Sequence, residues 1–509
     1  MRPARIAAAT AGALGVLLLG ALSTGPVAAA GSAHARAARP AQPAVLIRPA
    51  VVRAESARRG PPSTAYCEKH FKIACYQARQ IQRAYQLPAL YRRGITGAGQ
   101  TIVIVDSYGS PTVRHDLAVF DRAEHLPPPP SLRVIEPAGK VPPYRPTENR
   151  AGWAGETDLD VEYAHAIAPG ARILVVATPT SENEGTTGFP QIVRAENYVI
   201  SHHLGAVISQ SFSATEQTFP ARSAVLKLRS AYIAAARAGV TVLAASGDSG
   251  VADVKFNGST YYLHRVTSWP DSDPLVTGVG GTQLHLAAAG RARPATAWND
   301  TYNGPTNRYI MGMAAPTPLA SGGGISVLFS RPAYQNGVQQ VTGAGRGVPD
   351  ISMSAACNGA ADMYQSFAGQ PAGWYPTCGT SEATPEFAGI IALAAQVAGH
   401  PVGLVNPALY RMSALHAPGL ADVTAGGNTV SFRQGGKQGR QLHTIRGFRA
   451  GPGYDLASGT GTVSAPLFVP ELALLASHPH WSWLQVAATA DRIAGLPLAG
   501  SPAGFRAGP

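Results

Sequence analysis

Short apolar segments that alternate with helical stretches are the feature of this sequence that most limits its fold. Segments with the length and composition of buried strands lie at residues 101–105, 171–177, 206–209 and 240–245. Helical patterns occupy residues 190–204 and 220–238. This alternation is typical of a parallel sheet whose crossover helices cover both faces. We therefore predict an α/β fold with a mostly parallel central sheet and helices on both faces.

The first 35 residues have the pattern of a secretory signal peptide. Two arginines precede an apolar run over residues 6–22, and small residues follow as far as Ala35. No stop-transfer cluster of charges comes after this run, and no later segment is a convincing membrane span. We expect this segment to be cleaved, and the protein to be secreted and extracellular, with no membrane attachment.

Composition divides the rest of the chain into three parts. Residues 36–76 begin with many Ala, Pro and Arg residues and little periodicity, which predicts a short propeptide or linker. Residues 77–470 carry the alternating pattern and form the main domain. A break containing Pro and His follows, and we expect residues 471–509 to be a C-terminal tail.

The net charge of +12 is concentrated near the N-terminus. Residues 1–60 contain eight Arg and one Glu, a net charge of +7, which leaves +5 for the other residues. No later stretch clusters basic residues with aromatic ones, as nucleic-acid sites do. We therefore expect no nucleic-acid partner.

Four cysteines in an exported chain favour disulfides over thiol chemistry or a zinc site. Three pairings are possible. Proximity in the sequence favours Cys67–Cys75 and Cys357–Cys378, and the second bond would brace the segment that leads to Ser381.

Ser381 lies in the segment Gly379-Thr-Ser381-Glu, which opens a strongly apolar helical run at residues 387–395. A serine on a tight turn at the start of a buried helix is well placed to be a nucleophile, because the helix dipole favours negative charge there. Serine and threonine are also ordinary N-caps. This segment alone leaves both interpretations open.

Two carboxylates fall on the apolar face of a helix predicted from Gly155 to just before Pro169. On a helical wheel, Glu156 and Asp160 share the arc of the apolar side chains. The opposite arc, which we expect to face solvent, carries Asp158, Glu162 and His165. A preference for acids in the first helical turn explains Glu156 but not Asp160. Buried together, the two carboxyls would share protons and have separated pKa values.

Asp248 follows the apolar segment 240–245 directly, within Ser246-Gly-Asp248-Ser-Gly250. Open α/β sheets bind ligands at the carboxyl ends of their strands. This aspartate therefore either closes a turn or is a carboxyl kept neutral so that it donates a hydrogen bond to an oxyanion.

An ordered series of motifs, spread over about residues 77–465, resembles the sedolisin family. These motifs are Gly155–Asp160, Ala168–Gly170, Ala244–Gly250, Gly280–Thr282, Trp298–Asp300, Gly322–Gly324, Arg346–Asp350, Gly379–Ser381 and Ala450–Asp455. Sedolisins are serine-carboxyl peptidases with a subtilisin-like fold. The resemblance implies that Ser381 is the nucleophile, Glu156 the general base, Asp160 its orienting partner and Asp248 the protonated oxyanion donor. It also implies activity at acidic pH, where a carboxylate still accepts a proton and histidine is charged.

The family also has a calcium site, and the resemblance assigns it to Asp422, Asp455 and the backbone carbonyls of Val423, Gly451 and Gly453. Calcium takes several oxygen ligands, and glycines allow backbone carbonyls to converge. We accordingly expect one structural Ca²⁺ ion, protein or peptide substrates, and a monomer.

Three positions or segments depart from the family pattern. The segment before the main domain is much shorter than the family's folded propeptide. Phe212 replaces a frequent tryptophan, and Asp106 stands where a family member has a supporting glutamate.

Two alternative functions remain. One is a catalytically inactive secreted binding protein on the same fold. The other is an ordinary Asp-His-Ser protease of the subtilisin type, for which Asp106 resembles the catalytic aspartate and His165, placed on the predicted solvent arc, is the nearby histidine. A lipase-type Gly-x-Ser-x-Gly elbow does not surround Ser381.

Overall fold

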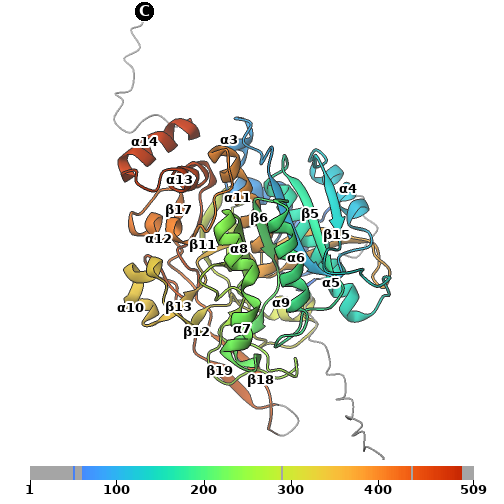
Figure 1. Cartoon of the computed structure of the whole chain (residues 1–509). Coiled ribbons are helices and arrows are strands. Elements are labelled where there is room, and N and C mark those ends of the chain that lie inside the picture. Colours follow the sequence, from blue (N-terminus) through green and yellow to red (C-terminus); the bar gives the residue numbers. More distant parts are fainter. Residues whose placement is uncertain (1–49, 52–59, 288–289, 437–439, 496–509) are drawn as a thin grey trace, which may run out of the picture. The chain divides into compact units, whose positions relative to one another are not determined.

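An eight-stranded sheet forms the centre of the computed structural model, which describes residues 50–51, 60–287, 290–436 and 440–495 (Figure 1). All of these residues belong to one unit, Pro43–Pro509. Seven strands follow the order β11-β10-β8-β6-β3-β5-β4, and the eighth, β14, pairs with β10. The strands are β3 (Thr101–Ser107), β4 (Leu132–Ile135), β5 (Arg172–Thr178), β6 (Val207–Gln210), β8 (Thr241–Ala245), β10 (Thr277–Leu286), β11 (Ala292–Ala297) and β14 (Ile351–Ser354). Every pair is parallel except β10–β11.

Alternate residues of each central strand enter two different hydrophobic cores. In β3, Ile102 and Ile104 pack in one core, while Val103 and Val105 pack in the other. Successive side chains of a strand point to opposite faces, so a sheet covered on both sides needs apolar residues throughout. The predicted α/β fold, with a mostly parallel sheet and helices on both faces, is confirmed.

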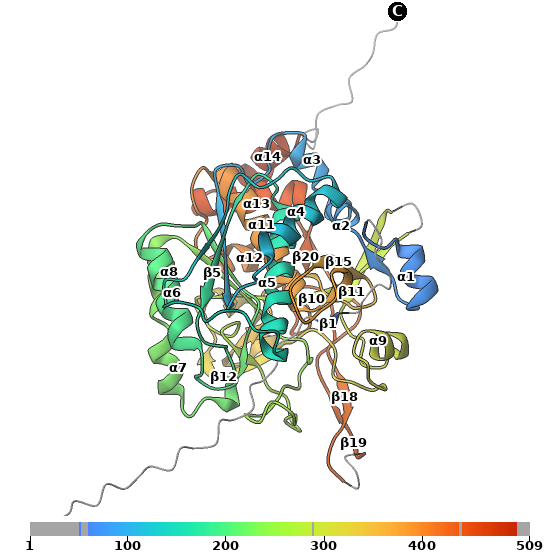
Figure 2. The same ribbon diagram turned by 90° about the vertical axis from the view of Figure 1, so that its right-hand side faces the viewer.

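Figure 2 shows the two helical layers from the side. One face is covered by α6 (Phe189–Ser201), α7 (Arg222–Leu228) and α8 (Ser230–Ala238). The other face is covered by α5 (Glu148–Ile167) and α11 (Thr380–Ala398), with α4 (Val113–Glu124) and α13 (Ala465–Ser477) packed against them. The helix predicted over 220–238 is divided at Arg229, which separates α7 from α8.

Smaller elements surround this centre. The helices are α1 (Thr64–His70), α2 (Ala78–Ala84), α3 (Pro88–Tyr91), α9 (Gly304–Tyr309), α10 (Gln339–Thr342), α12 (Asn406–Ala414) and α14 (Trp483–Ala494). A second sheet has the order β1-β16-β15-β2 and consists of β1 (Ala50–Val51), β2 (Cys75–Tyr76), β15 (Ala360–Gln365) and β16 (Gly373–Cys378). Four two-stranded sheets comprise β7 (Ala214–Thr215) with β9 (Ser268–Trp269), β12 (Gly324–Ser330) with β13 (Gly345–Val348), β17 (Leu420–Ala421) with β20 (Thr462–Val463), and β18 (Val430–Arg433) with β19 (Leu442–Ile445).

Helix α5 begins earlier than the sequence predicts and is buried on every side. The Thr147 side chain caps its first turn by accepting a hydrogen bond from the Arg150 N–H. The expectation that Asp158, Glu162 and His165 face solvent is wrong, because all three side chains are buried. Helix α4 and strand β15 pack over this face of α5 and exclude water from it.

Both predicted disulfides are present. Cys67–Cys75 joins α1 to β2, and Cys357–Cys378 ties the segment after β14 to the end of β16. The second bond lies immediately before α11 and therefore braces the turn that carries Ser381.

The ends of the main domain extend beyond the predicted boundaries. Residues 64–76 form α1 and β2, and their apolar side chains enter the main core. At the other end, the predicted boundary at residue 470 falls inside α13, and Val486 and Ala490 of α14 are buried in the same core. The predicted signal peptide lies outside the described residues. Among those that the structure describes, no helix is both long enough and apolar enough to cross a bilayer.

Candidate active site

Ser381 occupies the first turn of α11, and the turn before it has no room for a side chain. Gly379, the N-cap residue, has a φ of 135°, which L-amino acids with side chains rarely adopt. A Cβ atom at this position would lie 2.6 Å from Oδ2 of Asp248. Glycine therefore allows the segment before Ser381 to lie directly against the Asp248 carboxyl.

A proline inside α11 changes the hydrogen bonding of Ser381. Pro385 has no backbone N–H, so the Ser381 carbonyl lacks the donor that residue i+4 normally provides in a helix. The hydroxyl of Ser211, which follows β6, lies 3.4 Å from this carbonyl oxygen, the longer of its two acceptor contacts. The same hydroxyl also lies 2.8 Å from Oδ1 of Asp160. Ser211 thus connects Asp160 to the backbone of Ser381.

Glu156, Asp160 and Asp106 form a group of buried carboxyls beside Ser381. Each has an exposed fraction of 0%. Glu156 and Asp160 come from one face of α5, as predicted, while Asp106 comes from the carboxyl end of β3. No hydrogen bond of ordinary geometry reaches either oxygen of Glu156 or of Asp106 within the described part of the chain, although the Ser381 hydroxyl lies near Glu156 and the Thr157 hydroxyl near Asp106. No cation balances the three groups in the ion pairs found among described residues.

Burial raises the pKa values of all three carboxyls. The pKa of Asp106 is raised to about 7, mainly by loss of solvent. Burial also raises the pKa of Glu156 well above its ordinary value, and the charges of Asp106 and Asp248 raise it further, while the nearby Ser381 hydroxyl lowers it. The pKa of Asp160 is raised by burial and by the charges of Asp106 and Glu156. The three groups therefore titrate together, and protons are shared among them.

Asp248 follows β8, and its two carboxylate oxygens have different surroundings. Oδ1 accepts hydrogen bonds from the backbone N–H of Thr380 at 2.7 Å and from its hydroxyl at 2.8 Å. Oδ2 faces Gly379. Burial raises the pKa of Asp248 to about 6, although the hydrogen bonds from Thr380 act in the opposite direction. Because Oδ1 accepts both hydrogen bonds, a proton on this carboxyl belongs on Oδ2.

Ser381 and Asp248 line a common cavity of about 280 Å³, together with Phe212. No histidine is among the described residues that line this cavity. His165 lies on the opposite side of α5, where its Nε2 atom is 2.9 Å from the carbonyl oxygen of Pro127. The arrangement places a serine hydroxyl beside buried carboxyls, and the described residues of the cavity wall offer no imidazole to activate it.

Sequence reasoning missed the residues that connect these groups. Ser211 directly follows a predicted strand, so the rule that ligands bind at strand ends could have identified it. Thr380 belongs to the recognised Gly-Thr-Ser segment, but its bond to Asp248 spans 132 residues. Two further acids in the cavity wall, Glu184 and Asp253, belong to loops with no distinctive pattern.

The five residues predicted to hold calcium lie close together near the C-terminal end of the domain. Oδ2 of Asp422 accepts the N–H of Gly453 at 2.9 Å, and Oδ2 of Asp455 accepts the N–H of Gly451 at 3.0 Å. The Ser458 hydroxyl is 3.5 Å from the carbonyl oxygen of Val423 and 3.1 Å from Asp455 Oδ2. This all-oxygen donor set suits Ca²⁺ better than a soft metal ion.

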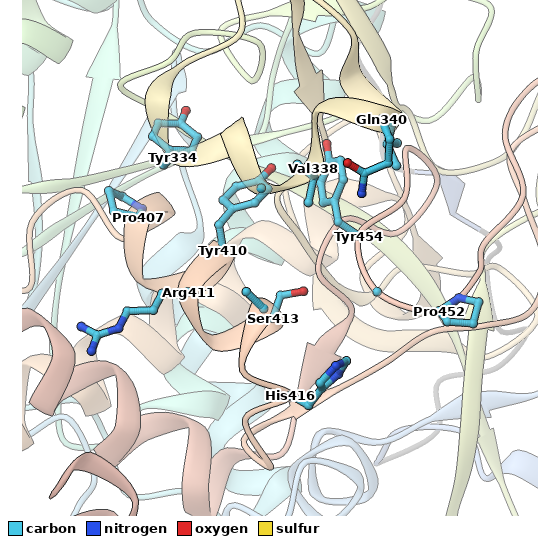
Figure 3. A pocket seen from close by; sticks show the side chains of 14 residues that line it. Tyr334, Val338, Gln340, Pro407, Tyr410, Arg411, Ser413, His416, Pro452 and Tyr454 are labelled. Atoms are coloured by element: carbon cyan, nitrogen blue, oxygen red, sulfur yellow. The ribbon is translucent and has the colours of Figure 1, made fainter. Parts of the chain in front are cut away.

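A second cavity, of about 630 Å³, lies beside this loop, away from Ser381 (Figure 3). Tyr334, Tyr410 and Tyr454 form much of its wall, and Pro452 and Gly453 belong to the loop that carries predicted calcium ligands. Tyr410 donates a hydrogen bond to Asp350 behind the wall. This contact anchors the tyrosine cluster to the core next to the predicted calcium ligands.

Comparison with known proteins gives consistent matches over most of the chain. The Subtilase family matches residues 149–436. Kumamolisin from Bacillus sp. (strain MN-32) is 31% identical over 402 residues, covering 76% of this chain and 62% of kumamolisin. Sedolisin from Pseudomonas sp. (strain 101) is 29% identical over 373 residues, covering 72% and 57%. Human tripeptidyl-peptidase 1 is 29% identical over 336 residues, covering 63% and 52%.

A solved structure matches as well. Pseudomonas sedolisin, a serine-carboxyl proteinase complexed with two molecules of pseudo-iodotyrostatin, aligns with a TM-score of 0.63 and 25% identity. The alignment covers 80% of this chain and 99% of that chain. The curated relatives are longer than their matched regions, so this chain spans between half and two thirds of their length.

Proposed function

This chain belongs to the sedolisin family, and we propose from that premise that it is a secreted serine-carboxyl endopeptidase that cleaves proteins or peptides at acidic pH. The observation that carries the proposal is the link from the Ser381 backbone through Ser211 to the buried carboxyl of Asp160, with Glu156 beside it. Buried carboxyls without a cationic partner destabilise a fold, so their presence next to a serine favours a catalytic role.

In the proposed reaction, the Ser381 hydroxyl attacks the carbonyl carbon of the peptide bond, and its proton passes to Glu156. The resulting oxyanion accepts a hydrogen bond from the protonated Oδ2 of Asp248. Glu156 then returns the proton to the leaving amine as the C–N bond breaks, and an ester remains on Ser381. Water attacks this ester by the same steps and releases the new carboxyl end. Asp160, held by Ser211, is a positioning residue for Glu156.

An ordinary glutamate would be ionised at mildly acidic pH and could act as a base. The raised pKa of Glu156 works against this ionisation. An isolated glutamate with such a pKa would be protonated and unable to accept a proton. Three carboxyls that share protons lose the first one more easily than the last, because the first ionisation meets no neighbouring negative charge. A single negative charge shared among Glu156, Asp160 and Asp106 is therefore the ionised form that the proposed mechanism uses as its base.

We also propose that Asp422, Asp455 and the carbonyls of Val423, Gly451 and Gly453 hold one Ca²⁺ ion. The ion would fix the loop between Gly451 and Asp455, and it has no part in the peptide chemistry. The support is that both carboxylates already contact this loop, by accepting the N–H groups of Gly451 and Gly453, and that the Ser458 hydroxyl lies between Asp455 and the carbonyl of Val423.

The test is hydrolysis of a mixed peptide pool by the full chain from pH 2 to pH 9, with Ser381→Ala and Glu156→Gln beside it. We expect an acid optimum and a loss of at least about 10³-fold in each variant, as when one member of a catalytic triad is removed. Glu196→Gln is the matched control, because Glu196 is also a buried glutamate but belongs to α6. Activity that peaks near pH 8 and survives Glu156→Gln would instead indicate a histidine base. Peptide binding without hydrolysis in the unmodified chain would favour the inactive binding protein.

A further inference from the structure

We infer that the cavity beside the Ser381 nucleophile binds a basic side chain, so that the enzyme prefers arginine or lysine at the residue whose carbonyl is attacked. This inference rests on the proposed peptidase function and specifies its substrate. The cavity of about 280 Å³ is small for a ligand pocket and suits one side chain rather than a whole peptide. Two of its wall residues are acids, Glu184 and Asp253.

The Glu184 carboxyl is held firmly in the wall. Its Oε2 atom accepts hydrogen bonds from the Thr215 N–H and the Thr218 hydroxyl, each at 2.9 Å. Its Oε1 atom has only a distant contact, 3.5 Å, with the Thr215 hydroxyl. Acceptor capacity therefore remains on Oε1, on a side chain that is already oriented.

Asp253, the second acid of the cavity wall, lies near the turn that carries Asp248. Its Oδ2 atom accepts a hydrogen bond from Ser268 at 2.9 Å. A Cβ atom built on Gly247, the residue before Asp248, would lie 4.0 Å from the same oxygen. A substrate side chain that leaves the scissile carbonyl near Asp248 would thus meet Asp253 first.

A third acid lies behind the wall and has no hydrogen-bond partner. Glu182 is buried, and neither of its oxygens forms a hydrogen bond within the described residues. Its charge interacts with those of Glu184 and Asp253. None of the ion pairs in the described ranges involves these three acids. The cation nearest in sequence, Lys255, lies over the ring of Tyr262 instead.

The titration of these groups agrees with a missing cation. Burial, followed by the charge of Asp253, raises the pKa of Glu184 to about 8. Two such carboxyls repel each other when both are ionised, and a positive charge between them offsets that repulsion. A guanidinium or ammonium group supplies that charge, and guanidinium also offers several donors to oxygens fixed in place.

The experiment uses two peptides that differ only at the residue before the scissile bond, arginine in one and citrulline in the other. Citrulline keeps the shape of arginine and loses its charge. With the full chain at pH 5, we expect kcat/KM to be at least about tenfold higher for the arginine peptide, as for a hydrogen bond to a charged group. The ratio should fall to within about threefold in Glu184→Gln and in Asp253→Asn. The control Glu196→Gln should keep the ratio of the unmodified chain.

Binding of the same two peptides to the Ser381→Ala chain separates failure of this inference from failure of the proposed function. If no peptide is hydrolysed but the arginine peptide binds about tenfold more tightly, the subsite stands and the catalytic proposal fails. If both peptides are hydrolysed and bound equally well, the peptidase proposal stands and the basic subsite is wrong.

Discussion

Replacing Asp248 by asparagine should remove the loss of activity on the alkaline side of the pH profile. Asparagine keeps an oxygen where Oδ1 accepts the two hydrogen bonds from Thr380. Its amide nitrogen takes the place of Oδ2, which faces Gly379, and donates a hydrogen bond at every pH. The variant thus imitates the protonated aspartic acid that the proposed mechanism requires.

The size of the effect follows from the titration of Asp248. Burial raises its pKa to about 6, so the donor is nearly complete at pH 4. Each pH unit above 6 lowers the protonated fraction tenfold, so about 1% remains at pH 8. We therefore expect kcat/KM of the unmodified enzyme to fall about 100-fold between pH 5 and pH 8 through this group alone. Asp248→Asn should lack this fall, whereas Asp248→Ala should lose about 10²–10³-fold at all pH values.

The assay is the initial rate of peptide hydrolysis from pH 3 to pH 9, after rapid transfer of enzyme kept at pH 4. Circular dichroism at each pH establishes that both proteins are still folded during the measurement. An Asp248→Asn profile that declines with the same midpoint as the unmodified enzyme would refute the oxyanion role, because the ionising group would then lie elsewhere.

Three further predictions concern stability and the turn before Ser381. Burial raises the pKa of Glu196 from its ordinary 4.5 to about 8, so its contribution to stability is full below about pH 4.5 and lost as pH rises through 8. Urea denaturation measures how much the free energy of unfolding decreases between pH 4 and pH 8. This decrease should be about 4 kcal/mol smaller for Glu196→Gln than for the unmodified chain, at about 1.4 kcal/mol per pKa unit. The same measurement on Glu68→Gln, at an exposed position, should match the unmodified chain. Removing calcium with a chelator should lower Tm, and adding free Ca²⁺ at 100 times its Kd should restore about 2.7 kcal/mol of stability. Asp422→Asn should abolish this response to Ca²⁺. An unchanged Tm in the unmodified chain would contradict the calcium proposal. Gly379→Ala should lower activity and cost about 1–3 kcal/mol of stability, because of the positive φ and the contact with Asp248; crystals or spectra showing an unchanged turn would oppose this reasoning.

The strands and helices next to the sheet could be predicted because their signals are local. The apolar segment predicted at 240–245 matches β8 to within one residue, and that predicted at 101–105 is extended by two residues to Ser107. Buried parallel strands need apolar residues throughout, and that composition is visible in a short window. The wheel of residues 155–168 also placed Glu156 and Asp160 in the core correctly.

The opposite face of α5 could not be predicted from a window of this size. Its acids, Asp158 and Glu162, have the composition of a solvent-facing arc. They are buried because α4 and β15 cover them, and β15 lies about 200 residues later in the sequence. One of these contacts, the hydrogen bond from the Tyr364 N–H to Glu162 at 3.0 Å, shows how a distant strand supplies a partner for one oxygen of a buried acid.

The residues of the candidate site also fall into those that local sequence could identify and those that it could not. Ser381 and Asp248 stand at a helix start and a strand end, where local sequence predicts exposed, functional positions. Thr380 and Ser211 could not be assigned partners, because each bond joins segments more than 50 residues apart. Local pattern therefore predicts which residues are unusual, and only the folded chain shows which of them meet.

The buried acids make acid dependence a property of the whole fold as well as of the reaction. Asp158, Glu162, Glu382 and Glu386 are all buried, and burial raises the pKa of each well above its ordinary value. Such groups favour folding at low pH, and this contribution is lost as pH rises through their folded pKa values. Activity is therefore lost at alkaline pH for two reasons, which act on different timescales. Ionisation of Asp248 is immediate and reversed at once by acid, whereas ionisation of the core acids requires opening of the helices around them. Activity regained instantly after a brief exposure to pH 8, but only partly after a long one, would separate the two.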